Sequence, residues 1–126
     1  MRRAVAVAAI AMLAGASSAA AKEGAQAHLL APLPANAAAG SHITIRWTVD
    51  VPGAGRTRRP FSAVGMFVTL VGADGAVTRA TAGGGPPYSV RVRVPRGGIH
   101  RIRFGLMGRS CGPSGCKPSP LFFALR

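Results

Sequence analysis

The chain of 126 residues contains 16 lysine and arginine residues but only three aspartate or glutamate residues, which gives a formal net charge of +13. A chain of this length builds one domain with a single modest core, and its charge makes it repel its own copies and attract polyanions. The three carboxylates form no pair, and no motif joins a serine or cysteine nucleophile to a histidine base. We therefore expect a protein that is not an enzyme and has no cofactor.

The first residues have the order of a secretory signal peptide. Arg2 and Arg3 precede an apolar run, and small residues follow as far as Ala21. We predict a signal peptide over residues 1–21, with cleavage after Ala27 as the alternative. A membrane anchor is the competing interpretation, but this alanine-rich segment is only weakly apolar for its length. The mature protein is thus expected to be secreted, periplasmic or associated with the cell envelope, without a membrane span.

Residues 22–40 are rich in alanine and proline, with one apolar group at positions 28–30. We expect a flexible lead that contains at most a short strand. Pro32 and Pro34 would confine this strand to a sheet edge, because proline cannot donate a ladder hydrogen bond. Residues 41–126 are expected to form the folded domain.

Residues 43–49 alternate between apolar and polar side chains, which is typical of a strand with one buried face. The apolar set comprises Ile43, Ile45, Trp47 and Val49. We interpret Trp47 as the anchor of the core. The next stretch, residues 52–60, has no periodic apolar residue and is expected to be a basic loop. It carries Arg56, Arg58 and Arg59.

Residues 64–71 are apolar on both faces, which indicates a strand that is covered on both sides. Asp74 and Gly75 follow directly, and this dipeptide favours a tight hairpin turn. Residues 76–81 would then be the return strand. The glycines and prolines of residues 83–87 predict a second loop.

The most regular pattern is the alternation of apolar residues with arginine over residues 88–94 and 99–106. If residues 96–98 form the loop between them, the two stretches make a hairpin with all apolar side chains on one face. The expected cross-strand pairs are Val92 with Ile102, Val90 with Phe104, Arg93 with Arg101, and Arg91 with Arg103.

The arginines of this hairpin are the candidate anion-contact residues. They are Arg91, Arg93, Arg101 and Arg103, extended by Arg96. Like charges opposite each other destabilise a ladder, so such a face is either solvated or placed on an anion. The expected partners are anionic wall polymers, lipid headgroups or acidic proteins. Nucleic acid is disfavoured because no aromatic residues alternate with the arginines. A solvated face that reflects only an arginine-rich composition is the alternative.

A final apolar block over residues 121–125 predicts a closing strand, and no segment after the signal shows helical spacing. Short strands separated by glycine and proline loops indicate an all-β fold. We predict an antiparallel immunoglobulin-like β-sandwich of about seven strands. A small closed sheet is the alternative.

Cys111 and Cys116 lie in a proline-bounded loop before this strand. A disulfide, half of a metal site or a redox pair could use them, and export favours the disulfide. A structural zinc site needs about four ligands, and the histidines are scattered. Redox motifs usually separate their cysteines by two residues, whereas four intervene here.

Residues 27–36, AHLLAPLPAN, resemble the mature start of the periplasmic copper-resistance protein C family. That resemblance implies that His28 becomes the first residue after signal cleavage. Its amine and imidazole would then bind copper(II) together with a histidine and an aspartate from the sandwich. No later segment of this chain places an aspartate next to a histidine, and the remaining histidines are His42 and His100.

Overall fold

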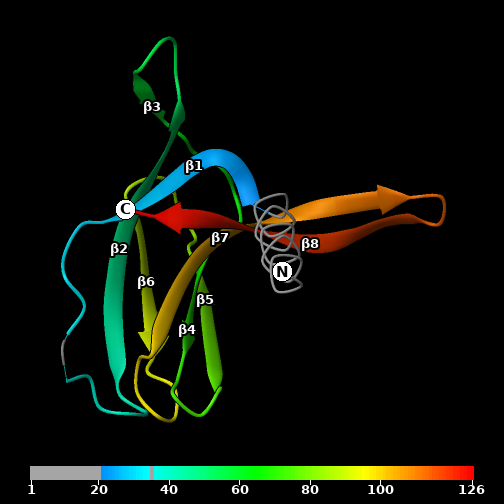
Figure 1. Ribbon diagram of the computed structural model, residues 1–126. Coiled ribbons are helices and arrows are strands. Elements are labelled where there is room, and N and C mark those ends of the chain that lie inside the picture. The colour runs from blue at the N-terminus through cyan, green and yellow to red at the C-terminus, as the bar shows by residue number, and fades with distance from the viewer. Residues whose placement is uncertain (1–20, 35) are drawn as a thin grey trace, which may run out of the picture.

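The computed structural model describes residues 21–34 and 36–126, so the predicted signal peptide lies outside the described part of the chain except for its last residue. All the helices and strands assigned in that part of the chain are β-strands; it contains no helix (Figure 1). The strands are β1 (Ala21–Leu29), β2 (His42–Pro52), β3 (Arg58–Pro60), β4 (Met66–Val71), β5 (Val77–Thr81), β6 (Tyr88–Arg93), β7 (Arg101–Gly112) and β8 (Gly115–Leu125). The predicted all-β class is confirmed.

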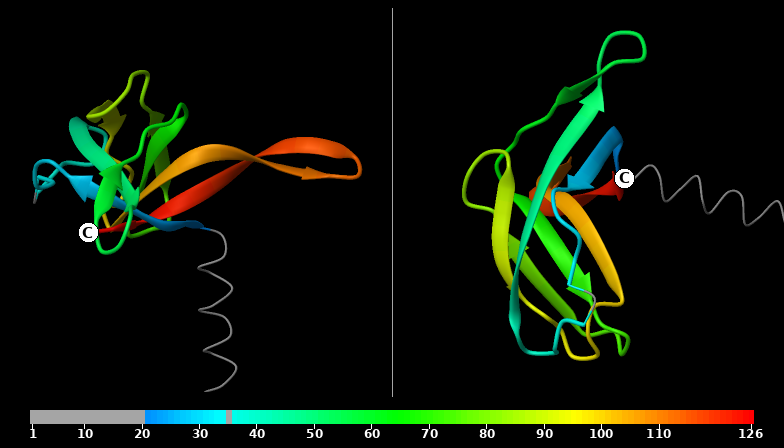
Figure 2. Two further views of the ribbon diagram at one scale, coloured as in Figure 1. Left: turned by 90° about the horizontal axis from the view of Figure 1, so that it is seen from above. Right: turned by 90° about the vertical axis from the view of Figure 1, so that its left-hand side faces the viewer.

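The strands form one curled sheet in the order β3-β2-β1-β8-β7-β4-β5, and β6 pairs with β2 beside this path. The pairing of β1 with β8 is parallel and the other pairings are antiparallel, so the sheet is mixed and the prediction of a purely antiparallel arrangement was wrong. The two ends of the sheet approach each other where β5 lies beside β6. There the Thr78 hydroxyl donates a 2.6 Å hydrogen bond to the Arg93 carbonyl. The curled sheet thus surrounds a core (Figure 2).

Trp47 is the centre of this core, as the alternation in β2 predicts. Its side chain is 0% exposed. The indole ring lies 5.6 Å from the ring centroid of Tyr88 on β6 and 5.0 Å from that of Phe104 on β7. Aromatic rings at these separations attract each other beyond their area burial. The cluster therefore joins the strands on the two sides of the core.

β1 lies in the interior of the sheet, between β2 and β8, and not at an edge as expected for this segment. Pro32 and Pro34 come after its last residue, Leu29, so they do not interrupt its ladders. Ala25 and Ala27 are buried in the core. Ala25 and Ala27 alternate with Gln26 and His28 in the sequence, but alanine is only weakly apolar, so this pattern gives little indication of a buried strand.

The predicted hairpin between residues 88–94 and 99–106 is wrong. β6 pairs with β2, where Val92 lies opposite Ile43, and β7 pairs with β4, where Ile102 lies opposite Leu70. The segment between β6 and β7 crosses from one side of the core to the other. The Val94 amide, just after β6, still donates to the Ser41 carbonyl next to β2, whereas β7 pairs with β4. The alternation correctly predicted which side chains face the core, but both sides of a core give the same pattern.

The hairpin between β4 and β5 is confirmed. Val71 lies opposite Val77, and Gly75 in the turn has a φ of 87°. The Asp74 carboxylate accepts a 3.0 Å hydrogen bond from the Ala76 amide. Glycine adopts this left-handed conformation without strain, and aspartate commonly bonds the backbone two residues ahead.

Two valines provide a matched test of the core. We expect Val68→Ala to lower the free energy of unfolding by about 2 kcal/mol, because it removes buried methyl groups and leaves a cavity. Val68 is 0% exposed, whereas Val64 is 95% exposed. Val64→Ala should therefore change the stability by less than about 0.5 kcal/mol in urea titrations of both variants. Equal effects would contradict the assignment of Val68 to the core.

Candidate functional site

The outer face of β2 and β6 carries one group of arginines. Arg91 lies opposite Thr44, and Arg46 lies opposite Ser89, which places these two arginines on a diagonal. Arg93 lies opposite His42, one further step along the same face. All three arginine side chains are exposed. Diagonal neighbours on one face are within reach of long side chains, so the three form one basic surface.

The outer face of β4, β5 and β7 carries a second group. Arg79 on β5 and Arg103 on β7 both lie opposite Thr69, one on each side of β4. The Arg79 Nε donates a 3.1 Å hydrogen bond to the Thr69 hydroxyl. Arg101 is exposed on the same face of β7, two residues from Arg103.

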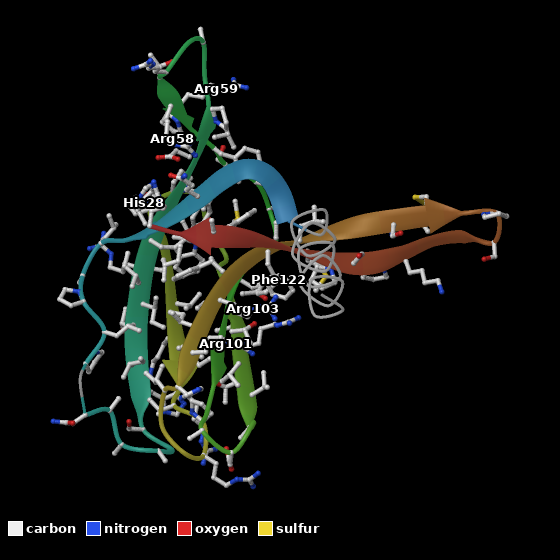
Figure 3. The ribbon with its side chains drawn as sticks, in the orientation of Figure 1. His28, Arg58, Arg59, Arg101, Arg103 and Phe122 are labelled. Atoms are coloured by element: carbon white, nitrogen blue, oxygen red, sulfur yellow. A yellow bond between two sulfur atoms is a disulfide. The ribbon has the colours of Figure 1, made fainter. Side chains whose placement is uncertain are left out.

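Both arginines that flank Thr69 lie over aromatic rings. The Arg79 guanidinium carbon is 4.3 Å from the Phe67 centroid, and that of Arg103 is 3.6 Å from the Phe122 centroid. The two rings meet edge to face with centroids 5.7 Å apart. Figure 3 shows Arg103 beside Phe122 over β7 and β8. A guanidinium stacked on a ring is attracted by the π face of that ring, and stacking does not block its in-plane N–H groups. Arg79 uses its Nε for Thr69, so its terminal N–H groups are the ones that could bind an anion.

Gly105 makes room for this aromatic pair. It lies opposite Phe67 on one side and Phe122 on the other. A Cβ atom at this position would lie 2.6 Å from the Phe67 ring. Such a contact is not tolerated, so the absence of a side chain at Gly105 lets the two rings meet across β7.

The structure divides the four predicted contact arginines between these two faces. Arg91 and Arg93 lie on β6, while Arg101 and Arg103 lie on β7, which is not paired with β6. The expected oppositions of Arg93 with Arg101 and of Arg91 with Arg103 do not occur. The arginines that continue the two faces, Arg46 and Arg79, were missed. Each alternates with core-facing residues in its strand, and that alternation was a usable signal.

Arg96, the fifth predicted contact residue, is paired with a carboxylate. Its Nε lies 3.0 Å from Asp74 Oδ2. The pKa of Asp74 is lowered, first by the hydrogen bond from the Ala76 amide and then by the one from Arg96. This pair links the β4–β5 turn to the segment that follows β6. Among the described side chains, no carboxylate forms an ion pair with the arginines of the two outer faces.

His28, Asp50 and Arg58 form a charged cluster at the junction of β1, β2 and β3. Figure 3 shows His28 and Arg58 at this junction. His28 Nε2 lies 2.8 Å from Asp50 Oδ2, and Arg58 Nε lies 2.5 Å from Asp50 Oδ1. Arg58 also donates to the backbone carbonyls of Gly24 and Asp50. Arg58 lies in the short strand β3, and not in a loop as expected. One carboxylate thus connects three strands.

This cluster brings an aspartate to His28, which the sequence did not predict. Asp50 is 22 residues away along the chain, and the β1–β2 pairing places it beside the imidazole. His42 and His100 lie elsewhere in the fold. The described residues contain no group of three or more histidine, cysteine, aspartate or glutamate side chains that could hold a metal ion.

The disulfide between Cys111 and Cys116 is confirmed. The two cysteines face each other across β7 and β8, and not within a loop as expected. The register places them one pair before the end of the β7–β8 hairpin. This hairpin projects from the body of the protein (Figure 1). We call residues 107–120 the arm. Most arm side chains are exposed, so the disulfide holds together strands that have almost no core of their own.

Comparison with protein-family models, curated proteins and solved structures finds no match for this chain. The described residues include no helix that is long and apolar enough to cross a membrane.

The Asp50 cluster predicts a loss of stability in acid. Burial raises the pKa of Asp50, but the hydrogen bonds from Arg58 and His28 outweigh it and bring the pKa below its ordinary 3.8. The unfolded chain then binds a proton that the folded chain does not. The resulting stability is therefore present above pH 4 and is lost as the pH falls through the lowered pKa. We expect Asp50→Asn to cost about 1 kcal/mol at pH 7.

Urea titrations between pH 7 and pH 2 measure this effect. The difference between the wild type and Asp50→Asn should shrink toward zero at the acid end. A difference that is independent of pH would show that the Asp50 charge contributes nothing. Asp74→Asn is the control variant. It removes a carboxylate that pairs with Arg96 and not with the Asp50 cluster, so its effect on the acid dependence of stability should add to that of Asp50→Asn.

The disulfide should stabilise mainly the arm. We expect Cys111→Ser with Cys116→Ser to accelerate amide hydrogen exchange at residues 108–119, because the open hairpin lacks buried contacts that would close it. Amides of β2 and β4 in the core should change far less. Exchange measured by NMR at neutral pH distinguishes the two regions, and equal acceleration in both would contradict a local role.

Proposed function

We propose that this protein is an exported module with a binding or structural role, which contacts anionic components of the cell envelope through the arginines of its outer strand faces. The supporting observation is the set of exposed arginines on each face that lack a carboxylate partner among the described side chains. We describe the fold as an immunoglobulin-like β-sandwich in which β2 and β6 face β4, β5 and β7 across the Trp47 core. The disulfide is compatible with export.

The chemistry that these faces recognise is a phosphate or carboxylate group. On the second face, Arg79 and Arg103 stand on either side of the Thr69 hydroxyl. Two guanidinium groups that are separated by one strand can contact successive anionic groups of a polymer or of a lipid surface. Arginine suits this role because its planar fork bonds two oxygens of one anion.

Binding to anionic vesicles and to anionic wall polymer tests the proposal. Arg91→Gln, Arg93→Gln, Arg101→Gln and Arg103→Gln together should lower retention at least about tenfold, because each arginine near an anionic surface contributes about 1 kcal/mol. Retention by the wild type should fall with added salt. The control variant replaces four exposed arginines elsewhere, Arg56, Arg59, Arg109 and Arg126, by glutamine. Equal losses in the two variants would mean that only net charge matters, which would refute the proposed faces.

Two double variants distinguish the sources of the anion. The pairs are Arg91→Gln with Arg93→Gln, and Arg101→Gln with Arg103→Gln. Because the two faces lie on different sides of the domain, a flat bilayer contacts one of them, and only one double variant should lose vesicle binding. A flexible polymer can contact both, so both double variants should lose part of the polymer binding.

Copper binding through His28 is the second candidate, and the proximity of Asp50 to the imidazole favours it. The copper site would need cleavage after Ala27 to supply the terminal amine, and Asp50 would have to release Arg58. Such cleavage would remove the buried Ala25 and Ala27 together with the pairing of β1 to β8. Mass spectrometry of the exported protein tests it, and a mature chain that begins at Lys22 would eliminate this candidate.

A further inference from the structure

The arm has two edges that differ in their capacity to accept another strand. Beyond Leu106, no strand in the described part of the chain pairs with β7 on the side of β4, because β4 begins at Met66, which lies opposite Leu106. Met107 donates the last hydrogen bond on this side, at 3.1 Å to the Gly65 carbonyl. Figure 1 shows the arm continuing away from the body beyond this point.

The positions of the prolines fix which backbone groups point outward. Pro118 lies opposite Arg109, and Pro120 lies opposite Met107. Since proline has no N–H, these pairs must be the non-hydrogen-bonded ones, and their backbone groups point away from the partner strand. The outward bond from Met107 to Gly65 agrees with this assignment. Alternation along β7 then makes the N–H and C=O groups of Arg109 and Cys111 point outward too.

The outer edge of β8 is closed to strand addition. Pro118 and Pro120 occupy two of the outward positions on this edge, and neither has a donor. Prolines on an exposed edge prevent unwanted pairing with other chains. The outer edge of β7 has no such protection: no hydrogen-bond partner is found in the described part of the chain for the N–H groups of Arg109 and Cys111. Only one edge of the arm is thus available.

The charge of the arm selects the occupant. Arg109 and Lys117 are exposed, and the arm contains no acidic residue. A second copy of the chain would place Arg109 against a like-charged arm, which disfavours self-pairing. Met107, which is 39% exposed, adds an apolar contact beside the edge. An extended segment with acidic side chains offers hydrogen-bond partners for the outward backbone groups of this edge and a negative charge to set against Arg109.

We propose that the β7 edge of the arm, at Arg109 and Cys111, binds an acidic extended polypeptide segment of a partner protein by strand addition. Backbone hydrogen bonds hold the segment in this mode, and side chains select it. The proposal is independent of the strand-face arginines, so the variant that lacks Arg91, Arg93, Arg101 and Arg103 should retain this binding.

Titration with a synthetic peptide of alternating threonine and glutamate, followed by NMR, tests the proposal. The amides of Arg109 and Cys111 should shift and become protected from exchange, while the Cys116 amide on the β8 edge should not. A peptide of alternating threonine and lysine should bind at least about tenfold more weakly, by the cost of like charges at close range. Equal binding of both peptides, or no change at Arg109 and Cys111, would overturn the proposal.

Substitutions at Arg109 separate the backbone from the charge. Arg109→Pro removes the outward N–H without breaking the ladder to β8, as Pro118 already does on the other strand. It should abolish the peptide-induced protection at Cys111, whereas Arg109→Gln should weaken binding only severalfold. Unchanged exchange of the β2 and β4 amides confirms that both variants are folded. Binding by Arg109→Pro equal to that of Arg109→Gln would exclude strand addition.

The opposite edge supplies a gain-of-function control. Pro118→Thr and Pro120→Thr restore two outward N–H groups on β8, so the peptide should then also protect the amides at these positions. A wild-type protein that dimerises through the arm, detected by sedimentation and by protection of Arg109 and Cys111 without peptide, would identify a second copy as the occupant and overturn the acidic segment.

Discussion

Burial of the Trp47 cluster is the constraint on which the arrangement of the other side chains depends. Trp47 contacts Tyr88 from the neighbouring strand and Phe104 from the far side of the core. Successive residues of a strand point to opposite faces, so each strand that contributes to this cluster must direct its intervening residues outward. Arg46, Arg91 and Arg103 occupy such positions. The basic surface is thus the direct counterpart of the apolar core.

The scarcity of carboxylates determines how the arginines are accommodated. The two described aspartates are used in local connections: Asp50 links β1, β2 and β3, and Asp74 links a turn to Arg96. Arg79 and Arg103 are instead placed over Phe67 and Phe122. Stacking on a ring orients a guanidinium without neutralising its charge. This second face therefore keeps the positive charge and the terminal N–H groups that an anion would need.

The arm follows different physical rules from the body of the protein. Most of its side chains are exposed, so it cannot be held by a core, and its strands are joined instead by the ladder between β7 and β8 and by the disulfide. Because proline has no N–H, Pro118 and Pro120 must occupy non-hydrogen-bonded positions of this ladder. The same arrangement leaves the outer edge of β8 without donors at these two positions, and it leaves the outward N–H groups of β7 available to another strand. A structural requirement and a binding property thus have one origin in the positions of two prolines.

The sequence by itself determined the all-β class, the inward direction of Trp47 and the valines of β6, the turn at Asp74 and Gly75, and the cysteine pair. These are local properties that follow from the period of the strand, from turn chemistry and from spacing. Tertiary structure alone decided that β6 pairs with β2 and β7 with β4, that β1 lies inside the sheet, and that Asp50 meets His28. Alternation specifies the face of a strand but not its neighbour, because strands on either side of a core bury their apolar residues with the same period.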